Sequence, residues 1–191
     1  MLISDYLERE DADSAQLSID NYAKFALDAF DSARVEQYTG QVYLLKDEPV
    51  EAIKLFQKSL KVFRDYDFYT DELETLLYLS EGYFAFKDFK KAIKYAQESL
   101  SIAKKNQKSS FISSSLEQLH KLYLASGDSK KAYEYLTKAR QRQDSIYNES
   151  KASIAGGMEA SQKLAEQEKN NLLLQKNAEI QEQTIQNQRI L

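Results

Sequence analysis

Residues 50–60 read Val-Glu-Ala-Ile-Lys-Leu-Phe-Gln-Lys-Ser-Leu, and the pattern returns at residues 90–100, as Lys-Lys-Ala-Ile-Lys-Tyr-Ala-Gln-Glu-Ser-Leu, and at residues 130–139, as Lys-Lys-Ala-Tyr-Glu-Tyr-Leu-Thr-Lys-Ala. The repeated alanines lie 40 residues apart, at Ala52, Ala92 and Ala132. A second small residue follows each alanine seven positions later, which is two helical turns and therefore the same helix face. The stretch predicts repeated helices that pack closely through small side chains.

A second helix precedes each of these stretches. A tyrosine stands nine residues before each repeated alanine, at Tyr43, Tyr83 and Tyr123, and leucines precede the second and third of these tyrosines at helical spacing. Short turns with Asp, Ser, Pro or Gly separate the two helices of a pair. We therefore predict helical hairpins with helices near 33–46 and 49–64, 69–86 and 89–105, and 109–126 and 129–148.

This pattern of leucines, a small residue, a tyrosine, a short turn and two small residues seven apart resembles the tetratricopeptide repeat. The resemblance covers residues 32–149 as three repeats and implies an all-α fold, an α-solenoid of helical hairpins. Two features depart from the family pattern. The period of 40 exceeds the family's usual 34, which implies longer helices or loops, and Glu36 stands where an apolar residue is usual.

The composition agrees with helices and excludes several classes of function. Five Gly and one Pro in 191 residues favour helix over sheet. There is no Cys and one His, so thiol catalysis, a disulfide and a His-rich metal site are excluded, and no cofactor is expected. A net charge of −4 gives no reason to expect direct nucleic-acid contact. We expect a protein that is not an enzyme.

The residues before the repeats predict a partial helical unit over 1–31. Residues 14–30 carry apolar side chains at helical spacing behind the acidic stretch 11–13, which predicts one amphipathic helix. The short apolar stretch 2–7 would be its partner. The sequence therefore predicts that the solenoid begins partway through a hairpin.

A compositional boundary separates the repeats from a tail over 150–191, because all 13 Tyr and 9 Phe lie at or before Tyr147. The tail is rich in helix formers and predicts a long helix, with a hinge or helix boundary at Gly156-Gly157. The best heptad seam is half apolar and comprises Leu164, Gln167, Asn171, Leu174, Ala178, Gln181, Ile185 and Gln188. Leu164, Leu174, Ala178 and Ile185 form the expected association seam of a weak homodimer. Two alternatives are packing on the repeats and a return along their groove.

The function that remains is binding of a protein or peptide in a concave groove lined by the first helix of each hairpin. By analogy with the resembled family, ten residues face this groove: Arg34, Gln37, Gln41, Glu74, Leu77, Glu81, Phe84, Ser114, Glu117 and Lys121. Chaperone-tail-binding members carry Lys and Asn where Gln37 and Gln41 stand here, so capture of an acidic C-terminal carboxylate is not expected. The three glutamates favour a neutral or basic peptide.

The repeats and the tail together resemble the repeat-plus-coiled-coil sensor segments of Bacteroidetes-type signalling proteins, namely histidine kinases and transcriptional regulators. This resemblance implies a sensing and dimerising role with an output domain beyond Leu191. It implies a periplasmic location, and contact with a membrane, only if a spanning helix follows Leu191, and a cytoplasmic location otherwise. The alternative is a free-standing scaffold that assembles protein partners.

Overall fold

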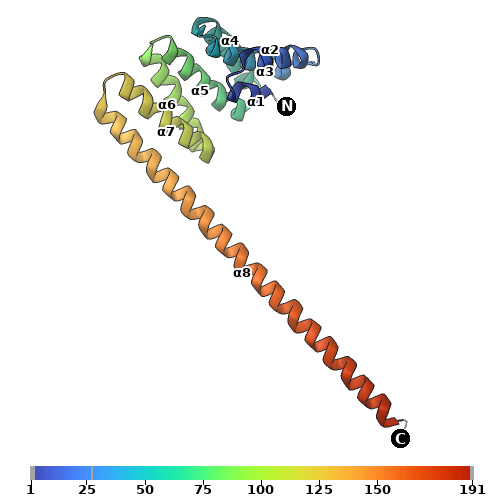
Figure 1. The fold of residues 1–191 in the computed structure, drawn as a ribbon. Coiled ribbons are helices and arrows are strands. Elements are labelled where there is room, and N and C mark those ends of the chain that lie inside the picture. The colour runs from blue at the N-terminus through green and yellow to red at the C-terminus, as the bar shows by residue number, and fades with distance from the viewer. Residues whose placement is uncertain (1–2, 27, 190–191) are drawn as a thin grey trace. The chain divides into compact units, whose positions relative to one another are not determined.

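The computed structural model describes residues 3–26 and 28–189, and in these residues it contains eight α-helices and no strand (Figure 1). The chain forms two compact units, Met1–Arg142 and Gln143–Leu191. The helices are α1 (Ile3–Glu8), α2 (Ala12–Ala23), α3 (Ala29–Leu45), α4 (Pro49–Asp65), α5 (Tyr69–Ala85), α6 (Phe89–Lys105), α7 (Ser109–Ala125) and α8 (Ser129–Arg189). The predicted all-α fold with tetratricopeptide-like hairpins is confirmed.

The 40-residue period consists of two equal halves. The helices α3 to α7 each have 17 residues, and three residues connect each helix to the next. The residues beyond the usual period of the resembled family therefore lengthen the helices, while the connections stay short. Of the two alternatives that the sequence left open, longer helices are therefore observed and longer loops are not.

Each of these helices ends in the same way. The second residue after the helix has a positive φ, and these residues lie 20 apart: Asp47, Asp67, Lys87, Gln107 and Gly127. The next backbone N–H then donates to a carbonyl five residues earlier, as Asp88 N does to Tyr83 O at 2.9 Å. This geometry is a Schellman motif, which satisfies carbonyls that a helix end would otherwise leave unpaired. The side chains of Asp88 and Asp128 then cap the following helices, as predicted.

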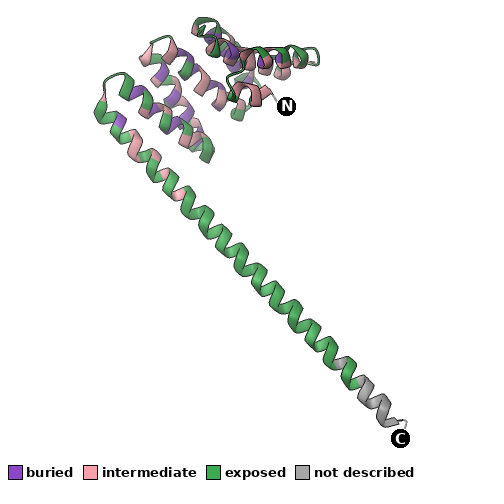
Figure 2. Cartoon of the chain, viewed as in Figure 1, coloured by how far each residue is buried: buried purple, intermediate pink, exposed green. Residues whose placement is uncertain are grey.

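The core of the repeats comprises leucine, isoleucine, alanine and aromatic side chains of the repeated helices, and Figure 2 shows buried residues along these helices. The side chains of Ala52, Ala92 and Ala132 are buried. Gly40 lies against Phe56, and a Cβ atom at position 40 would stand 2.6 Å from the Phe56 ring. The side chain of Phe56 is fully buried, so α3 and α4 approach closely only because residue 40 lacks a side chain.

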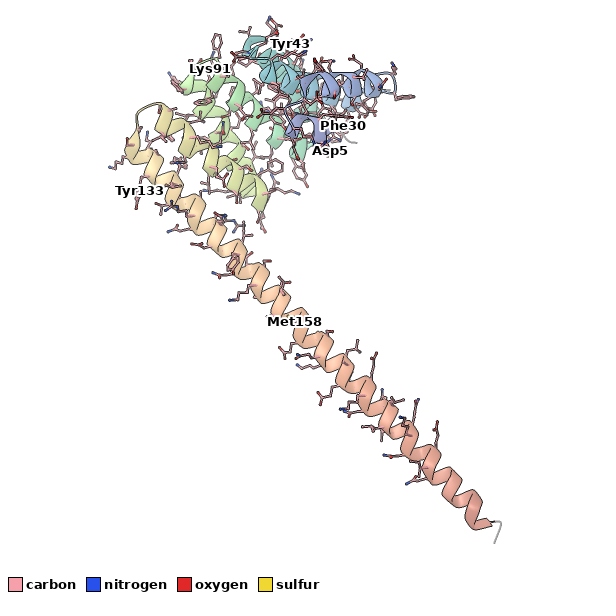
Figure 3. All side chains as sticks on the ribbon, viewed as in Figure 1. Asp5, Phe30, Tyr43, Lys91, Tyr133 and Met158 are labelled. Carbon is pink, nitrogen blue, oxygen red and sulfur yellow. The ribbon has the colours of Figure 1, made fainter. Side chains whose placement is uncertain are left out.

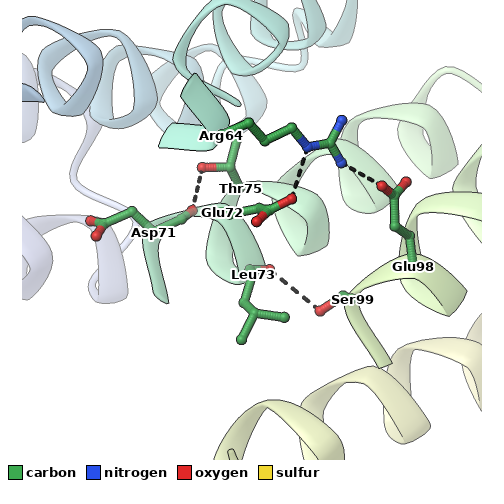
Figure 4. Close-up of polar contacts among 7 residues, drawn as sticks. All are labelled: Arg64, Asp71, Glu72, Leu73, Thr75, Glu98 and Ser99. Atoms are coloured by element: carbon green, nitrogen blue, oxygen red, sulfur yellow. Dashed lines mark hydrogen bonds and ion pairs between the residues drawn. The ribbon is translucent and has the colours of Figure 1, made fainter. Parts of the chain in front are cut away.

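Polar side chains connect successive helices at the edge of the core (Figure 4). Arg64 on α4 donates to Glu72 on α5 at 2.8 Å and also to Glu98 on α6. The buried hydroxyl of Ser99 on α6 donates to the Leu73 carbonyl on α5 at 3.4 Å. One arginine therefore joins three consecutive helices, although exposed ion pairs of this kind contribute at most about 1 kcal/mol each.

The prediction of one helix over residues 14–30 is wrong. Helix α2 ends at Ala23, and Phe30 belongs to α3. The Asp28 side chain accepts from the backbone N–H of Asp31 at 2.8 Å and so begins a new helix. Phe30 packs in α3 against Phe63 and Phe68, with ring centroids 5.9 and 4.4 Å away. Aromatic packing and the cap therefore outweigh the apolar spacing that continues from α2.

The predicted hinge or helix boundary at Gly156-Gly157 is also wrong, because α8 continues through both glycines. Two glycines cost about 2 kcal/mol in a helix. Starting a new helix costs about 4 kcal/mol, from a nucleation constant of about 10⁻³. Continuing the helix through the glycines therefore costs less free energy than ending it and starting a new one. None of the helices in the described residues is sufficiently long and apolar to span a membrane.

Candidate functional site: two adjoining chambers on α1, α3 and α5

The helices α1, α3 and α5 line two adjoining cavities in the repeat unit. The larger, which we name the apolar chamber, has a volume of about 340 Å³ and is lined by Leu7, Gln41, Leu44, Leu45, Tyr78, Glu81, Phe84 and Ala85. The smaller, the polar chamber, has a volume of about 290 Å³ and is lined by Ser4, Leu7, Glu8, Arg34, Tyr38, Gln41, Glu74 and Tyr78. Leu7, Gln41 and Tyr78 line both, so the two chambers are neighbours.

The repeat period places equivalent residues of α3 and α5 in these chambers. Arg34 and Glu74 are 40 residues apart, as are Gln41 and Glu81, and Leu44 and Phe84. Within each helix the three positions are separated by seven and three residues, which keeps them on one face. Equivalent repeat positions therefore supply side chains of one kind: Arg34 and Glu74 line the polar chamber, and Leu44 and Phe84 line the apolar chamber.

An arginine that is already paired stands in the polar chamber. The Arg34 Nε atom lies 3.5 Å from a carboxylate oxygen of Asp71. The Arg34 guanidinium also lies 5.4 Å from the ring centroid of Phe30 and 5.8 Å from that of Tyr38. These contacts hold Arg34 in place and largely neutralise its charge.

The carboxyl groups of the chambers are harder to ionise than free carboxyl groups. Burial raises the pKa of Glu74, the nearby Asp71 raises it further, and Arg34 opposes the rise. Desolvation raises the pKa of Glu81, although part of its surface stays exposed, and the Lys121 ammonium on α7 opposes that rise. Burial and the charge of Glu74 raise the pKa of the Tyr78 phenol. The chambers therefore contain negative charge that the protein itself compensates only in part.

Half of the ten groove residues predicted from the sequence line these chambers: Arg34, Gln41, Glu74, Glu81 and Phe84. Leu77 is half-buried on α5. Gln37 does not face the groove as expected, because its side chain is fully buried and donates to the Thr75 hydroxyl at 2.8 Å. It therefore packs α3 against α5 and offers no exposed surface to a ligand.

The three candidates on α7, Ser114, Glu117 and Lys121, are exposed and line neither chamber. Sequence reasoning missed eight lining residues: Ser4, Leu7, Glu8, Tyr38, Leu44, Leu45, Tyr78 and Ala85. The repeat period could have found Leu44, since it lies 40 residues before the candidate Phe84. Leu7 gave no signal, because only the packing of α1 brings it to the site.

The residues around His120 pack two helices together. The ring Nδ1 of His120 on α7 lies 2.9 Å from the Ala132 carbonyl oxygen on α8. No group of three or more His, Cys, Asp or Glu in the described part of the chain is arranged to hold a metal ion.

The residues of the predicted association seam belong to α8, in the unit 143–191. Leu164 and Leu174 are 58% and 67% exposed, and Met158 is 64% exposed (Figure 3). The side chains of Ala178 and Ile185 lie outside the described residues, so their part of the seam stays a prediction. Exposed leucines spaced along a helix are compatible with helix pairing.

Comparison with known proteins identifies the repeat. Residues 31–105 match the family model described as tetratricopeptide repeat. The repeats of this part of the chain are therefore similar to tetratricopeptide repeats. Repeats of this family are generally non-catalytic and bind other proteins. A search of curated proteins found no significant match to this sequence.

Several solved structures share the fold. The TPR domain of Arabidopsis FLU is 22% identical, with a TM-score of 0.57, over 59% of this chain and 95% of that domain. The apo form of RapI is 17% identical, with a TM-score of 0.66, over 76% of this chain and 54% of RapI. A signal transduction ATPase (STAND) protein with a tetratricopeptide repeat sensor from Pyrococcus horikoshii is 25% identical, with a TM-score of 0.64, over 78% of this chain and 24% of that protein. The chain thus spans about half of RapI and a quarter of the STAND protein.

Proposed function

We propose that the repeats bind a segment of a partner protein, without catalysis, in the two chambers lined by α1, α3 and α5. The observation that carries this proposal is that an apolar and a polar chamber lie next to each other and that five predicted groove residues line them. A recess with apolar walls and a few charged groups is the usual form of a site that recognises a ligand. Helices that pack through small side chains give such a recess a rigid wall.

We further propose that the chain is the sensing and dimerising part of a signal-transduction protein or transcriptional regulator. Two observations support this role. The STAND protein with a similar fold is described as carrying a tetratricopeptide repeat sensor. The long helix α8 exposes leucine side chains in the unit 143–191, and exposed leucines are accessible to a second chain.

Site-specific crosslinking tests the binding surface. A photoreactive benzoylphenylalanine replaces Gln41, which lines both chambers, in the full chain produced in its own cells. The matched control carries the same group at Lys61, an exposed position on α4. We expect one discrete crosslinked protein from position 41 and none from position 61. No crosslink at 41, or the same products at both positions, would contradict the proposed site.

Light scattering of the full chain tests dimerisation. Leu164→Asp together with Leu174→Asp places two charges on the seam and should reduce the measured mass from two chains to one. Ser161→Asp together with Gln175→Asp adds the same charge at exposed positions outside the seam and serves as the control. A wild-type chain that is monomeric at high concentration refutes dimerisation, and an unchanged mass in the leucine variant refutes the seam.

A further inference from the structure

We propose that the two chambers select a segment that presents a lysine or arginine to the polar chamber and, on the same face, a large apolar side chain to the apolar chamber. This inference rests on the proposed function and names the chemistry of its partner.

The first step is the charge balance of the lining. Glu8, Glu74 and Glu81 line the chambers and carry three carboxylates. Within the described residues, none of the three has a Lys or Arg nitrogen within 4.0 Å. The only lining cation, Arg34, is paired with Asp71, which lies outside the lining. The lining therefore carries negative charge that a positive charge in the ligand can compensate.

The second step is the energetic state of these carboxylates. Burial already disfavours the charged form of Glu74, and Asp71 adds repulsion. A cation placed beside Glu74 would relieve both effects, and the low-polarity surroundings would strengthen the attraction. A carboxylate or phosphate placed there would face Glu8 and Glu74, which line the polar chamber, and would lose its own hydration. The lining therefore discriminates against acidic segments by repulsion as well as by lost attraction.

The third step is the apolar chamber. Leu7, Leu44, Leu45, Phe84 and Ala85 form most of its wall. Leu45 is 37% exposed, so apolar surface stays in contact with water when the chamber is open. Covering apolar surface yields about 25 cal/mol per Å², which favours a leucine, methionine or phenylalanine side chain here.

The fourth step is the distance between the two side chains in the partner. The chambers share Leu7, Gln41 and Tyr78, so they are separated by no more than the width of this shared wall. Two side chains can enter neighbouring chambers only when they lie on one face of a short segment. The partner positions are therefore i and i+2 in an extended segment, or i and i+3 or i+4 in a helix.

Selection from a display library of random 12-residue peptides tests the inference on the full chain. We expect peptides with a Lys or Arg and a large apolar residue at one of these spacings to be enriched. Binding of a selected synthetic peptide should weaken by at least tenfold in Glu74→Lys and should fall with added salt. Glu168→Lys, with the same charge change at an exposed position on α8, should leave the affinity unchanged.

The outcomes separate this inference from the proposed function. Enrichment of acidic or uncharged peptides whose binding still depends on Tyr78 and Gln41 overturns the charge inference and leaves the binding site in place. If no selected peptide loses affinity on substitutions in either chamber, both the charge inference and the proposed binding function are overturned. Glu74→Gln keeps the shape of the side chain, so it supplies the test if Glu74→Lys loses its helical circular dichroism signal. Equal peptide affinity in Glu74→Gln and the wild type would then contradict the inference.

Discussion

The two units of this chain are both helical, yet their helices rest on different physical causes. In the repeat unit, α3 to α7 bury one face each, and side chains such as Phe56 and Leu79 are fully buried. In the unit 143–191, the large apolar side chains that the structure describes are exposed. The repeats are therefore stabilised by packing, whereas the helix of the second unit depends on residue propensity and its own hydrogen bonds. The comparison shows that helical content alone does not report tertiary stability in this protein.

The largest expected difference comes from removing a buried ring. Phe56→Ala should reduce the free energy of unfolding of the repeats by about 3–5 kcal/mol, because a cavity remains between α3 and α4. Ile154→Ala, at an exposed position of α8, should leave it unchanged. Tyrosine fluorescence during urea unfolding reports the repeats selectively, since residues 150–191 contain no aromatic residue. Equal losses in the two variants would contradict the comparison.

Overpacking the core of the repeats should also lower their free energy of unfolding, by a smaller amount. Ala92→Phe forces a ring between helices that approach closely, and should cost about 1–3 kcal/mol. Ala165→Phe, on the exposed surface of α8, is the matched control and should shift the thermal unfolding of the repeats by nothing measurable. An unshifted transition in Ala92→Phe would show that the register of the repeats is wrong.

Stabilising substitutions in α8 test the comparison from the second unit. Gly156→Ala together with Gly157→Ala should stabilise the α8 helix by about 2 kcal/mol, since neither Cβ atom would meet another atom within 4 Å. The far-ultraviolet circular dichroism of the chain should increase at 25 °C. The fluorescence transition of the repeats should stay in place, and a shift of that transition would mean that the two units unfold as one.

The smallest expected effect is a pH-dependent change in the stability of the fold. The pKa of Glu74 is raised in the folded state, so the folded chain holds this proton more tightly than the unfolded chain. The stability that follows is fully present below the unfolded pKa of about 4.3 and is lost as the pH rises through the folded value. Glu74→Gln should therefore be more stable than the wild type at pH 7 and equal to it below pH 4. Urea midpoints at both pH values measure this, with Glu117→Gln as the exposed control.

The repeats could be predicted from the sequence because each position recurs at a fixed period, so that Ala92 is supported by Ala52 and Ala132. The end of α2 could not, because the residues between Ala23 and Asp28 include neither Gly nor Pro and the apolar spacing continues across them. The continuity of α8 was missed because propensity is local, whereas helix formation is cooperative over many residues.

Half of the candidate groove could likewise be predicted from family analogy. Gln37 was misplaced because the analogy carries over a helix position without the depth of its side chain, and here Thr75 offers it a buried partner. Leu7 and Glu8 were missed because α1 has six residues and no repeat counterpart in the sequence. Residues that reach a site only through tertiary packing leave no periodic signal.

Amide hydrogen exchange of the full chain, measured segment by segment at a concentration where light scattering finds single chains, tests the central claim most directly. We predict slow exchange in α3 to α7, limited by unfolding of the whole repeat unit, and exchange within seconds in residues 150–177, limited by local opening of an exposed helix. Equal protection of residues 150–177 and the repeats would contradict the account, because it would show that packing stabilises both units.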